Sequence, residues 1–229
     1  MGQQVPATYT PVAESQAVAY LTVALTLALK QNPPEQIGVY TLALAWIETG
    51  AGQSLIQNNP GNMSCYADGR DWSGDYWRPP WFDSTDPKYA ALHERMLNGQ
   101  APSAFRAYPT QEAGWAAFVH EVVRRKGLLA AMMADDPLAV VRALRGSGYS
   151  ADYRDEVAKS FASLVKAFRS RGAFAPYIGV ELDGLPSAST APPAAPKKVG
   201  GGGGGGAVLA LLAAVGAAGA YFLSKKRRK

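Results

Sequence analysis

The sequence predicts a mainly helical α+β domain that carries one small irregular lobe, followed by a single C-terminal transmembrane helix. Three observations support this fold class. Apolar residues recur at helical spacing through much of the first 178 residues. Pro, Gly, Trp and Tyr crowd residues 60–108 and interrupt that period. A stretch without charge, residues 207–223, lies near the C-terminus.

Two helices are expected before the irregular lobe. Thr10 and Pro11 form a typical N-cap followed by a proline at the first helical position, so the first helix is expected to run to about Lys30. The sequence "NPPE" at 32–35 opens the second helix with a Glu at the capping-box position. This helix is apolar until Glu48, where a glycine-rich turn is expected to end it.

More helices are expected within and after the lobe. Residues 60–108 show little helical period apart from a short helix at 88–97. Further helices are expected at 110–126 and 136–145. In the last helix the apolar residues of 157–168 are spaced by four, three, one and three, which predicts one buried stripe.

The remaining chain separates by composition. Residues 1–178 form the expected domain, and residues 179–206 are rich in Pro, Ala and Gly, which predicts a flexible linker. The uncharged run 207–223 would form a helix about 26 Å long, close to the thickness of the hydrocarbon core, so we expect a transmembrane helix at 207–224. The basic residues 225–229 follow it directly.

Charge and cysteine usage limit the function classes. The formal net charge is +5, and the five basic residues 225–229 can account for all of it. The domain is therefore close to neutral, and no specific nucleic-acid binding is expected. Cys65 is the only cysteine, and His93 and His120 lack metal-ligand spacing, so we expect no disulfide framework, metal or cofactor.

Two expectations about the membrane conflict. The positive-inside rule places the basic tail in the cytoplasm and the domain outside. However, the N-terminal stretch has no Lys or Arg before Lys30, and its apolar run 17–29 is only thirteen residues long, which is not the pattern of a signal peptide. The sequence leaves the orientation open.

Glu48 is the first candidate for chemistry. Ile37, Thr41, Leu44 and Glu48 are separated by four, three and four residues, so the carboxylate shares a face with apolar side chains. Apolar surroundings raise the pKa of a carboxylate. A Glu that is protonated near neutral pH is the group with which a glycosidase protonates its leaving oxygen.

Four motifs around Glu48 resemble the signature of the lysozyme superfamily's glucosaminidase branch, which includes flagellar and autolysin-type enzymes. They occur in the family's order over about residues 35–170: "ETGAGQS" with "NNPGNM", then "DWSG", then "AFRAYPTQEAGWAAFVHEV", and last "GYSADYRDEV". The "NNPGN" form is also similar to phage-encoded cell-wall hydrolases. The resemblance implies a lysozyme-like fold that hydrolyses the β-1,4 bonds of peptidoglycan.

The resemblance also implies roles for residues of the first and the last motif. Glu48 would be the general acid, and Tyr149 matches the family's cleft tyrosine, which contacts the sugar or positions a water or the N-acetyl group. Asp152 and Tyr153 would support that wall of the cleft. Asp152 is equally compatible with the N-terminal cap of the last helix.

Carbohydrate contacts are expected from the turn and the lobe. Asn58 and Asn59 would shape the turn or bind acetamido groups. Trp72, Trp77 and Trp81 are candidates to stack on sugar faces. The aromatic group also includes Tyr76 and Phe82, and two or three of these five are expected to form the lobe's core instead.

The second carboxylate departs from the family pattern, because no Glu of the lobe stands in a matching motif. Asp83 and Asp86 lie at a suitable distance along the chain, whereas Glu94 falls on the expected short helix; we choose Asp83. Without a second carboxylate, the substrate's acetamido group would participate. Alternatively, Glu48 would act alone as acid and then base, as in a lytic transglycosylase.

These observations predict a membrane-anchored peptidoglycan hydrolase of the endo-β-N-acetylglucosaminidase type. A muramidase or a lytic transglycosylase on the same scaffold is the first alternative, and an inactive glycan-binding or structural membrane protein is the second. The expected partners are glycan strands, the lipid bilayer through Ala207–Leu223, and other virion or envelope proteins. The virion membrane of a phage is favoured over a bacterial envelope as the location.

Overall fold

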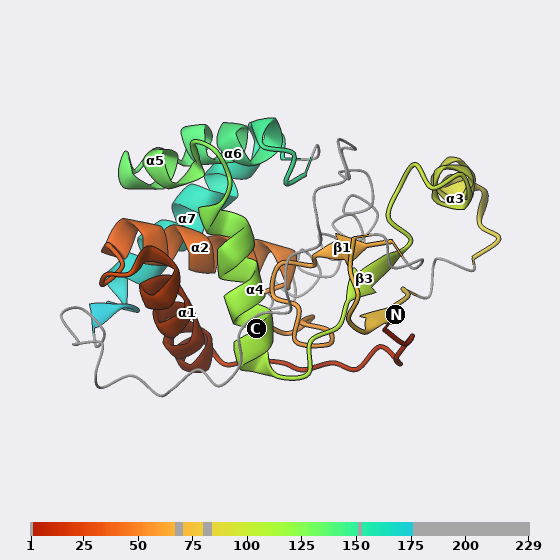
Figure 1. Cartoon of the computed structure of the whole chain (residues 1–229). Helices are drawn as coiled ribbons and strands as arrows, with labels where there is room; N and C mark the ends of the chain where they lie inside the picture. The colour runs from red at the N-terminus through yellow and green to blue at the C-terminus, as the bar shows by residue number, and fades with distance from the viewer. Residues whose placement is uncertain (1, 67–70, 80–83, 151–152, 176–229) are drawn as a thin grey trace, which may run out of the picture.

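The computed structural model describes residues 2–66, 71–79, 84–150 and 153–175. It shows a mainly helical body beside a small lobe that holds an antiparallel sheet (Figure 1). The predicted helical domain with one irregular lobe is therefore confirmed. The body is made of α1 (Glu14–Leu29), α2 (Glu35–Glu48), α4 (Gln111–Val123), α5 (Leu128–Met133), α6 (Pro137–Gly146) and α7 (Val157–Ser170).

Local capping explains where two of these helices begin. The hydroxyl of Thr110 accepts a hydrogen bond from the backbone N–H of Ala113 at 3.2 Å at the start of α4. The carboxylate of Asp136 accepts from two backbone N–H groups at 2.9 and 3.1 Å at the start of α6, where Pro137 occupies the first position. Both helices begin where the sequence predicted.

The predicted start of the first helix was wrong. α1 begins at Glu14 after the N-cap Ala13, not at Thr10. The backbone and hydroxyl of Thr10 are instead bonded to the loop that follows α2, through Leu55 and Asn58. A long-range contact therefore replaces the local cap. The short α5 was not predicted from the sequence.

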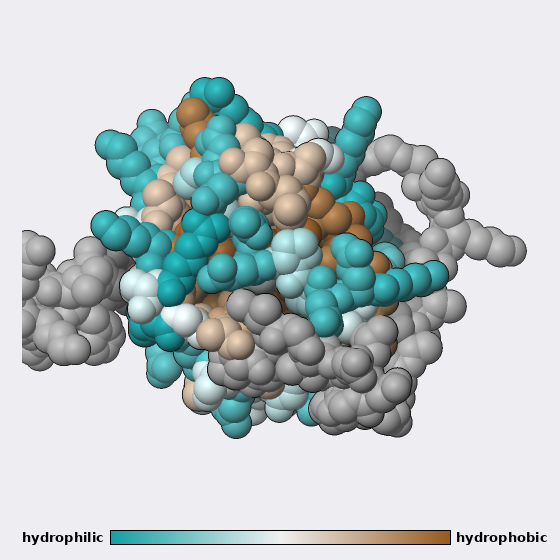
Figure 2. All heavy atoms as spheres, turned by 90° about the vertical axis from the view of Figure 1, so that its left-hand side faces the viewer, coloured by the Kyte–Doolittle hydropathy of each residue, from teal (hydrophilic) through white to brown (hydrophobic). Residues whose placement is uncertain are grey.

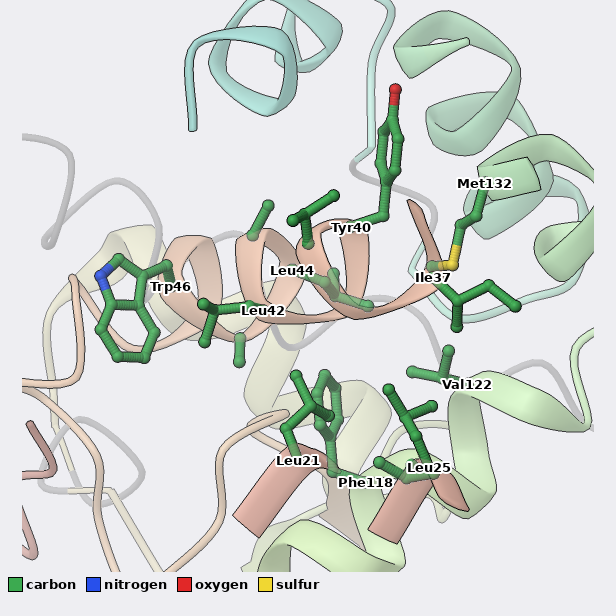
Figure 3. Packing of buried hydrophobic residues seen from close by; sticks show 14 of the residues in the cluster. Leu21, Leu25, Ile37, Tyr40, Leu42, Leu44, Trp46, Phe118, Val122 and Met132 are labelled. Atoms are coloured by element: carbon green, nitrogen blue, oxygen red, sulfur yellow. The ribbon is translucent and has the colours of Figure 1, made fainter. Parts of the chain in front are cut away.

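α2 runs through the centre of the body. Its residues Ile37 to Trp46 are all buried, so this helix is enclosed on every side, as expected for a core helix. In Figure 3, Tyr40 lies on one side of α2, while Leu21 of α1 and Phe118 of α4 lie on the other. Helices α1, α5 and α7 pack against α2. The packing of the body therefore also fixes the position of the last residue of α2, Glu48.

The lobe contains a sheet of β1 (Ser64–Cys65), β2 (Tyr76–Trp77) and β3 (Ala104–Arg106) in the order β1-β3-β2. Ser64 pairs with Phe105, and Tyr76 pairs with Arg106. A 3₁₀ turn η2 (Pro87–Tyr89) and α3 (Ala90–Leu97) form an excursion between β2 and β3 (Figure 1). These two elements confirm the short helix predicted at 88–97.

The N-terminal segment ties the lobe to the body. Gln4 forms a bridge with Tyr76 of β2, and Tyr9 forms a bridge with Ile56 in the loop after α2. The side-chain amide of Gln111, on α4, donates to the carbonyl of Thr10 at 2.9 Å. This extended N-terminal segment therefore contacts the sheet, the loop after Glu48 and the body helix α4.

The predicted linker 179–206, the transmembrane helix 207–224 and the basic tail 225–229 lie outside the described residues. In the described part of the chain, no helix has both the length and the apolar character needed to cross a bilayer. Hydrophilic side chains cover most of the face seen in Figure 2, with apolar ones visible between them.

Candidate active site

Glu48 is the last residue of α2, and its side chain is buried at the junction of body and lobe. The residue is 3% exposed. Its Oε1 accepts a hydrogen bond from the Tyr153 hydroxyl at 2.5 Å, while Oε2 has no hydrogen-bond partner among the described residues. A buried carboxylate with one unpaired oxygen is costly to keep charged.

The electrostatics of Glu48 follow from this burial. Burial raises the pKa of Glu48 from 4.5 to about 7, while the hydrogen bond from Tyr153 and the nearby Asn62 amide act in the opposite direction. The carboxyl is therefore substantially protonated at neutral pH. This is the proton state that a general acid needs, in agreement with the reasoning from the helix face.

Tyr153 holds Glu48 from the interior. It is 1% exposed and packs against Tyr149 at 6.0 Å and Phe161 at 6.2 Å between ring centroids. Burial and the charge of Glu48 raise its pKa well above its usual value, so the phenol remains a hydrogen-bond donor. The sequence assigned Tyr153 to the substrate-binding wall, whereas the structure buries it behind the carboxyl.

Tyr149 is partly buried beside the same carboxyl. Its hydroxyl donates to the carbonyl of Gly61 at 3.2 Å, and the guanidinium of Arg125 lies 5.6 Å from its ring centroid. Burial, followed by the charge of Glu48, raises its pKa well above the usual value. The structure thus brings together the predicted residues Glu48, Tyr149 and Tyr153.

Asn58 and Asn59 both serve the turn after α2. The amide of Asn58 donates to the carbonyl of Tyr108 at 2.8 Å. Asn59 is 1% exposed; its amide donates to the carbonyls of Met63 and Arg106, both at 3.0 Å. Because its amide nitrogen bonds both carbonyls, Asn59 connects the turn to the sheet. It therefore shapes the turn, which is the first of the two roles considered for it.

The two described tryptophans of the candidate set differ in exposure. Trp77 is 1% exposed and stacks on Phe105 at 4.9 Å in the lobe's core, so its ring offers no face to a sugar. Trp72 is partly buried, with its indole N–H donating to the carbonyl of Asp75 at 2.7 Å and the Arg106 guanidinium 5.1 Å from its ring. Trp81, Asp83 and Asp152 lie outside the described residues.

The other two carboxylates considered as a partner for Glu48 lie at the start of η2 and on α3. Asp86 accepts a hydrogen bond from the backbone N–H of Lys88 at 3.0 Å and pairs with the ammonium of Lys88 at 2.9 Å. Glu94 lies exposed on α3. No charged group of the described residues contributes to the pKa of Glu48.

Sequence reasoning missed two contacts of the site. Asn62 is 5% exposed, and its side-chain amide donates to the backbone carbonyl of Glu48. Arg125 bonds the carbonyl of Ser147 at 2.7 Å and thereby holds the loop before Tyr149. The third asparagine of "NNPGN" was a signal for Asn62, since Asn tolerates the left-handed backbone conformation and its side chain bonds to backbone groups in turns.

The described residues contain no group of three or more His, Cys, Asp or Glu side chains that could hold a metal ion. The described residues around Glu48 contribute its carboxyl, two phenols and side-chain amides. Such a set can donate a proton and stabilise the resulting carboxylate.

Comparison with protein-family models and with curated proteins finds no match. Among solved structures, the chain is similar to the glycoside hydrolase domain from Salmonella typhimurium FlgJ. The identity is 18%, the TM-score is 0.44, and the match covers 73% of this chain and 95% of that domain. At this TM-score and identity, the similarity does not establish family or activity.

Proposed function

We propose that this chain is a glycoside hydrolase that cleaves β-1,4 bonds of peptidoglycan, with Glu48 as the general acid. The environment of Glu48 carries this proposal: the carboxyl is buried, its pKa is about 7, and one oxygen is held by Tyr153 while the other is unpaired. The sequence motifs around Glu48 supply the substrate class.

The hydrogen-bond pattern assigns the two oxygens different tasks. Because the Tyr153 hydroxyl donates to Oε1, the proton of the neutral carboxyl belongs on Oε2. Transfer of that proton to the glycosidic oxygen lets the bond to the anomeric carbon break with a neutral leaving group. Tyr153 then stabilises the carboxylate that remains, so it lowers the cost of charge development in a buried site.

We propose the endo-β-N-acetylglucosaminidase type of cleavage, as the motif order suggests. Lytic transglycosylase action is the second candidate, because Asp86 pairs with Lys88 and Glu94 lies exposed on α3, so neither of these two carboxylates is placed as a partner of Glu48. In that route Glu48 protonates the leaving oxygen and then takes a proton from the sugar hydroxyl that closes the anhydro ring.

Mass spectrometry of purified peptidoglycan digested by the full chain, beside Glu48→Gln, tests the proposal. Reducing GlcNAc ends indicate a glucosaminidase, reducing MurNAc ends a muramidase, and anhydro-MurNAc ends a lytic transglycosylase. Fragments from the parent but not from Glu48→Gln support the acid role of Glu48. If neither protein releases fragments, a glycan-binding or structural role replaces the proposed one.

We also propose that residues 207–224 anchor the domain to a membrane through the linker 179–206. A tether keeps the enzyme at a high effective concentration near the adjacent wall. The phage-like "NNPGN" form supports a virion membrane as the location, where the domain would lyse the wall locally during infection. Flotation with liposomes of the full chain, compared with a chain lacking 207–229, tests the anchor.

A further inference from the structure

The N-terminal segment, residues 3–12, precedes the motifs of the proposed site, yet it pairs with the loop that follows α2. Tyr9 and Ile56 form an antiparallel bridge within this pairing. The two stretches also approach closely at Gly52, where a Cβ would lie 2.7 Å from the carbonyl oxygen of Val12. The N-terminal segment therefore packs directly against the loop at the end of α2.

All three polar groups of Thr10 are hydrogen-bonded to other parts of the chain. Its N–H donates to the carbonyl of Leu55 at 2.8 Å, and its hydroxyl accepts from the backbone N–H of Asn58 at 3.0 Å. Its carbonyl accepts from the side-chain amide of Gln111, the first residue of α4, at 2.9 Å. Thr10 therefore connects a body helix to the loop that follows Glu48.

Asn58 begins a turn that leads back to Glu48. Within this turn the N–H of Asn62 donates to the carbonyl of Asn59 at 3.2 Å. The side-chain amide of Asn62 donates to the backbone carbonyl of Glu48, the last residue of α2. The turn 58–62 is thus hydrogen-bonded to Thr10 at one end and to Glu48 at the other.

We propose that Thr10 is a positioning residue: its hydroxyl fixes the turn 58–62, and through this turn it holds the end of α2, where the proposed acid Glu48 lies. The catalytic meaning of this inference rests on the proposed function. The hydrogen bonds themselves exist without substrate, so they can be tested without turnover.

The backbone of the loop explains why it needs such a contact. Ala51, Gln57 and Asn58 have φ values of 60°, 51° and 55°, in the left-handed region that costs free energy for residues with a Cβ. A conformation of this kind persists only where the surrounding structure holds it. Because the Thr10 hydroxyl bonds the N–H of Asn58, its removal should let the turn open more often.

Two further substitutions make the test of Thr10→Val specific. Thr10→Val removes the hydroxyl but keeps the branched shape and both backbone hydrogen bonds, whereas Thr10→Ser keeps the hydroxyl. Thr8→Val is the matched control in the same segment. The carbonyl of Thr8 accepts from the N–H of Gln57 at 2.9 Å, but its exposed side chain forms no hydrogen bond with the described residues.

Amide hydrogen exchange of the full chain, resolved to single residues, measures the effect without substrate. We expect Thr10→Val to raise the exchange rates of the Asn58 and Asn62 amides about five- to tenfold, which corresponds to the loss of one intramolecular hydrogen bond. The amides of α7 should keep their rates, since the domain as a whole stays folded. Thr10→Ser and Thr8→Val should leave the turn amides at the rates of the parent.

The proposal is overturned if Thr10→Val leaves both turn amides unchanged or if Thr8→Val accelerates them equally. Thr10→Ala decides by the same criterion if Thr10→Val does not fold. Where the parent cleaves peptidoglycan, Thr10→Val should lower kcat with little change in KM, and Thr10→Ser should restore it; an unchanged kcat overturns the positioning role. A parent without cleavage refutes the proposed function, whereas the exchange rates still decide whether Thr10 fixes the turn.

Discussion

Replacing Glu48 by Gln should stabilise the folded domain at alkaline pH. Burial raises the pKa of Glu48 from 4.5 to about 7. Between these values the native state holds a proton that the unfolded chain has released, so the free energy of unfolding falls as the pH rises. A shift of this size corresponds to about 3 kcal/mol at pH values above 7. Gln resembles the protonated acid and does not carry this cost.

Denaturant unfolding of the full chain at several pH values measures this effect. At pH 4 both the folded and the unfolded chain bind the proton, so the parent and Glu48→Gln should differ little. At pH 9 the variant should be more stable by about 3 kcal/mol, with an unchanged m-value. Two stability curves that remain parallel from pH 4 to pH 9 would refute the raised pKa and with it the proposed acid.

Glu121→Gln is a control whose effect on the free energy of unfolding should have the opposite sign. Glu121 is also buried, which alone would raise its pKa, but the hydrogen bond and charge of Arg124 and the charge of Arg125 lower it overall. Its contribution to stability is present above its unfolded pKa and is lost as the pH falls through the lower folded value. Glu121→Gln should therefore destabilise the protein at pH 8 and have much less effect in strong acid.

Three further substitutions test the site and the lobe. Tyr153→Phe removes the 2.5 Å hydrogen bond to Glu48 and should lower the cleavage rate about tenfold or more. The alkaline limb of the pH–rate profile should move to higher pH. If this limb does not move, the hydroxyl does not act on the carboxyl. Trp77→Ala leaves a cavity in the lobe's core and should lower the free energy of unfolding, measured with denaturant, by about 3–5 kcal/mol. If activity is lost while stability is unchanged, the ring instead contacts the substrate. Gly61→Ala places a Cβ 2.5 Å from Phe118 and should destabilise by about 1–3 kcal/mol. Gly146→Ala, which meets no heavy atom within 4 Å, is the control for Gly61 in thermal unfolding.

Local patterns in the sequence were enough for most of the secondary structure. The caps at Thr110 and Asp136 and the apolar stripe of α7 depend on residues within one or two turns, so they can be read without the fold. The start of α1 could not be read in this way, because the hydroxyl of Thr10 bonds across the chain to the turn at Asn58. A cap motif is a local preference that a long-range partner can override.

The sequence by itself determined that Glu48 ends a helix on the face of Ile37 and Leu44, because helical spacing fixes which residues share a face. Only the tertiary structure decided what surrounds that carboxyl. Tyr153 reaches it from 105 residues away and Asn62 from fourteen, and burial by the whole body raises its pKa. Hydrogen bonds of this kind depend on the relative placement of elements, and burial depends on all of them together, so neither is encoded in a short stretch of residues.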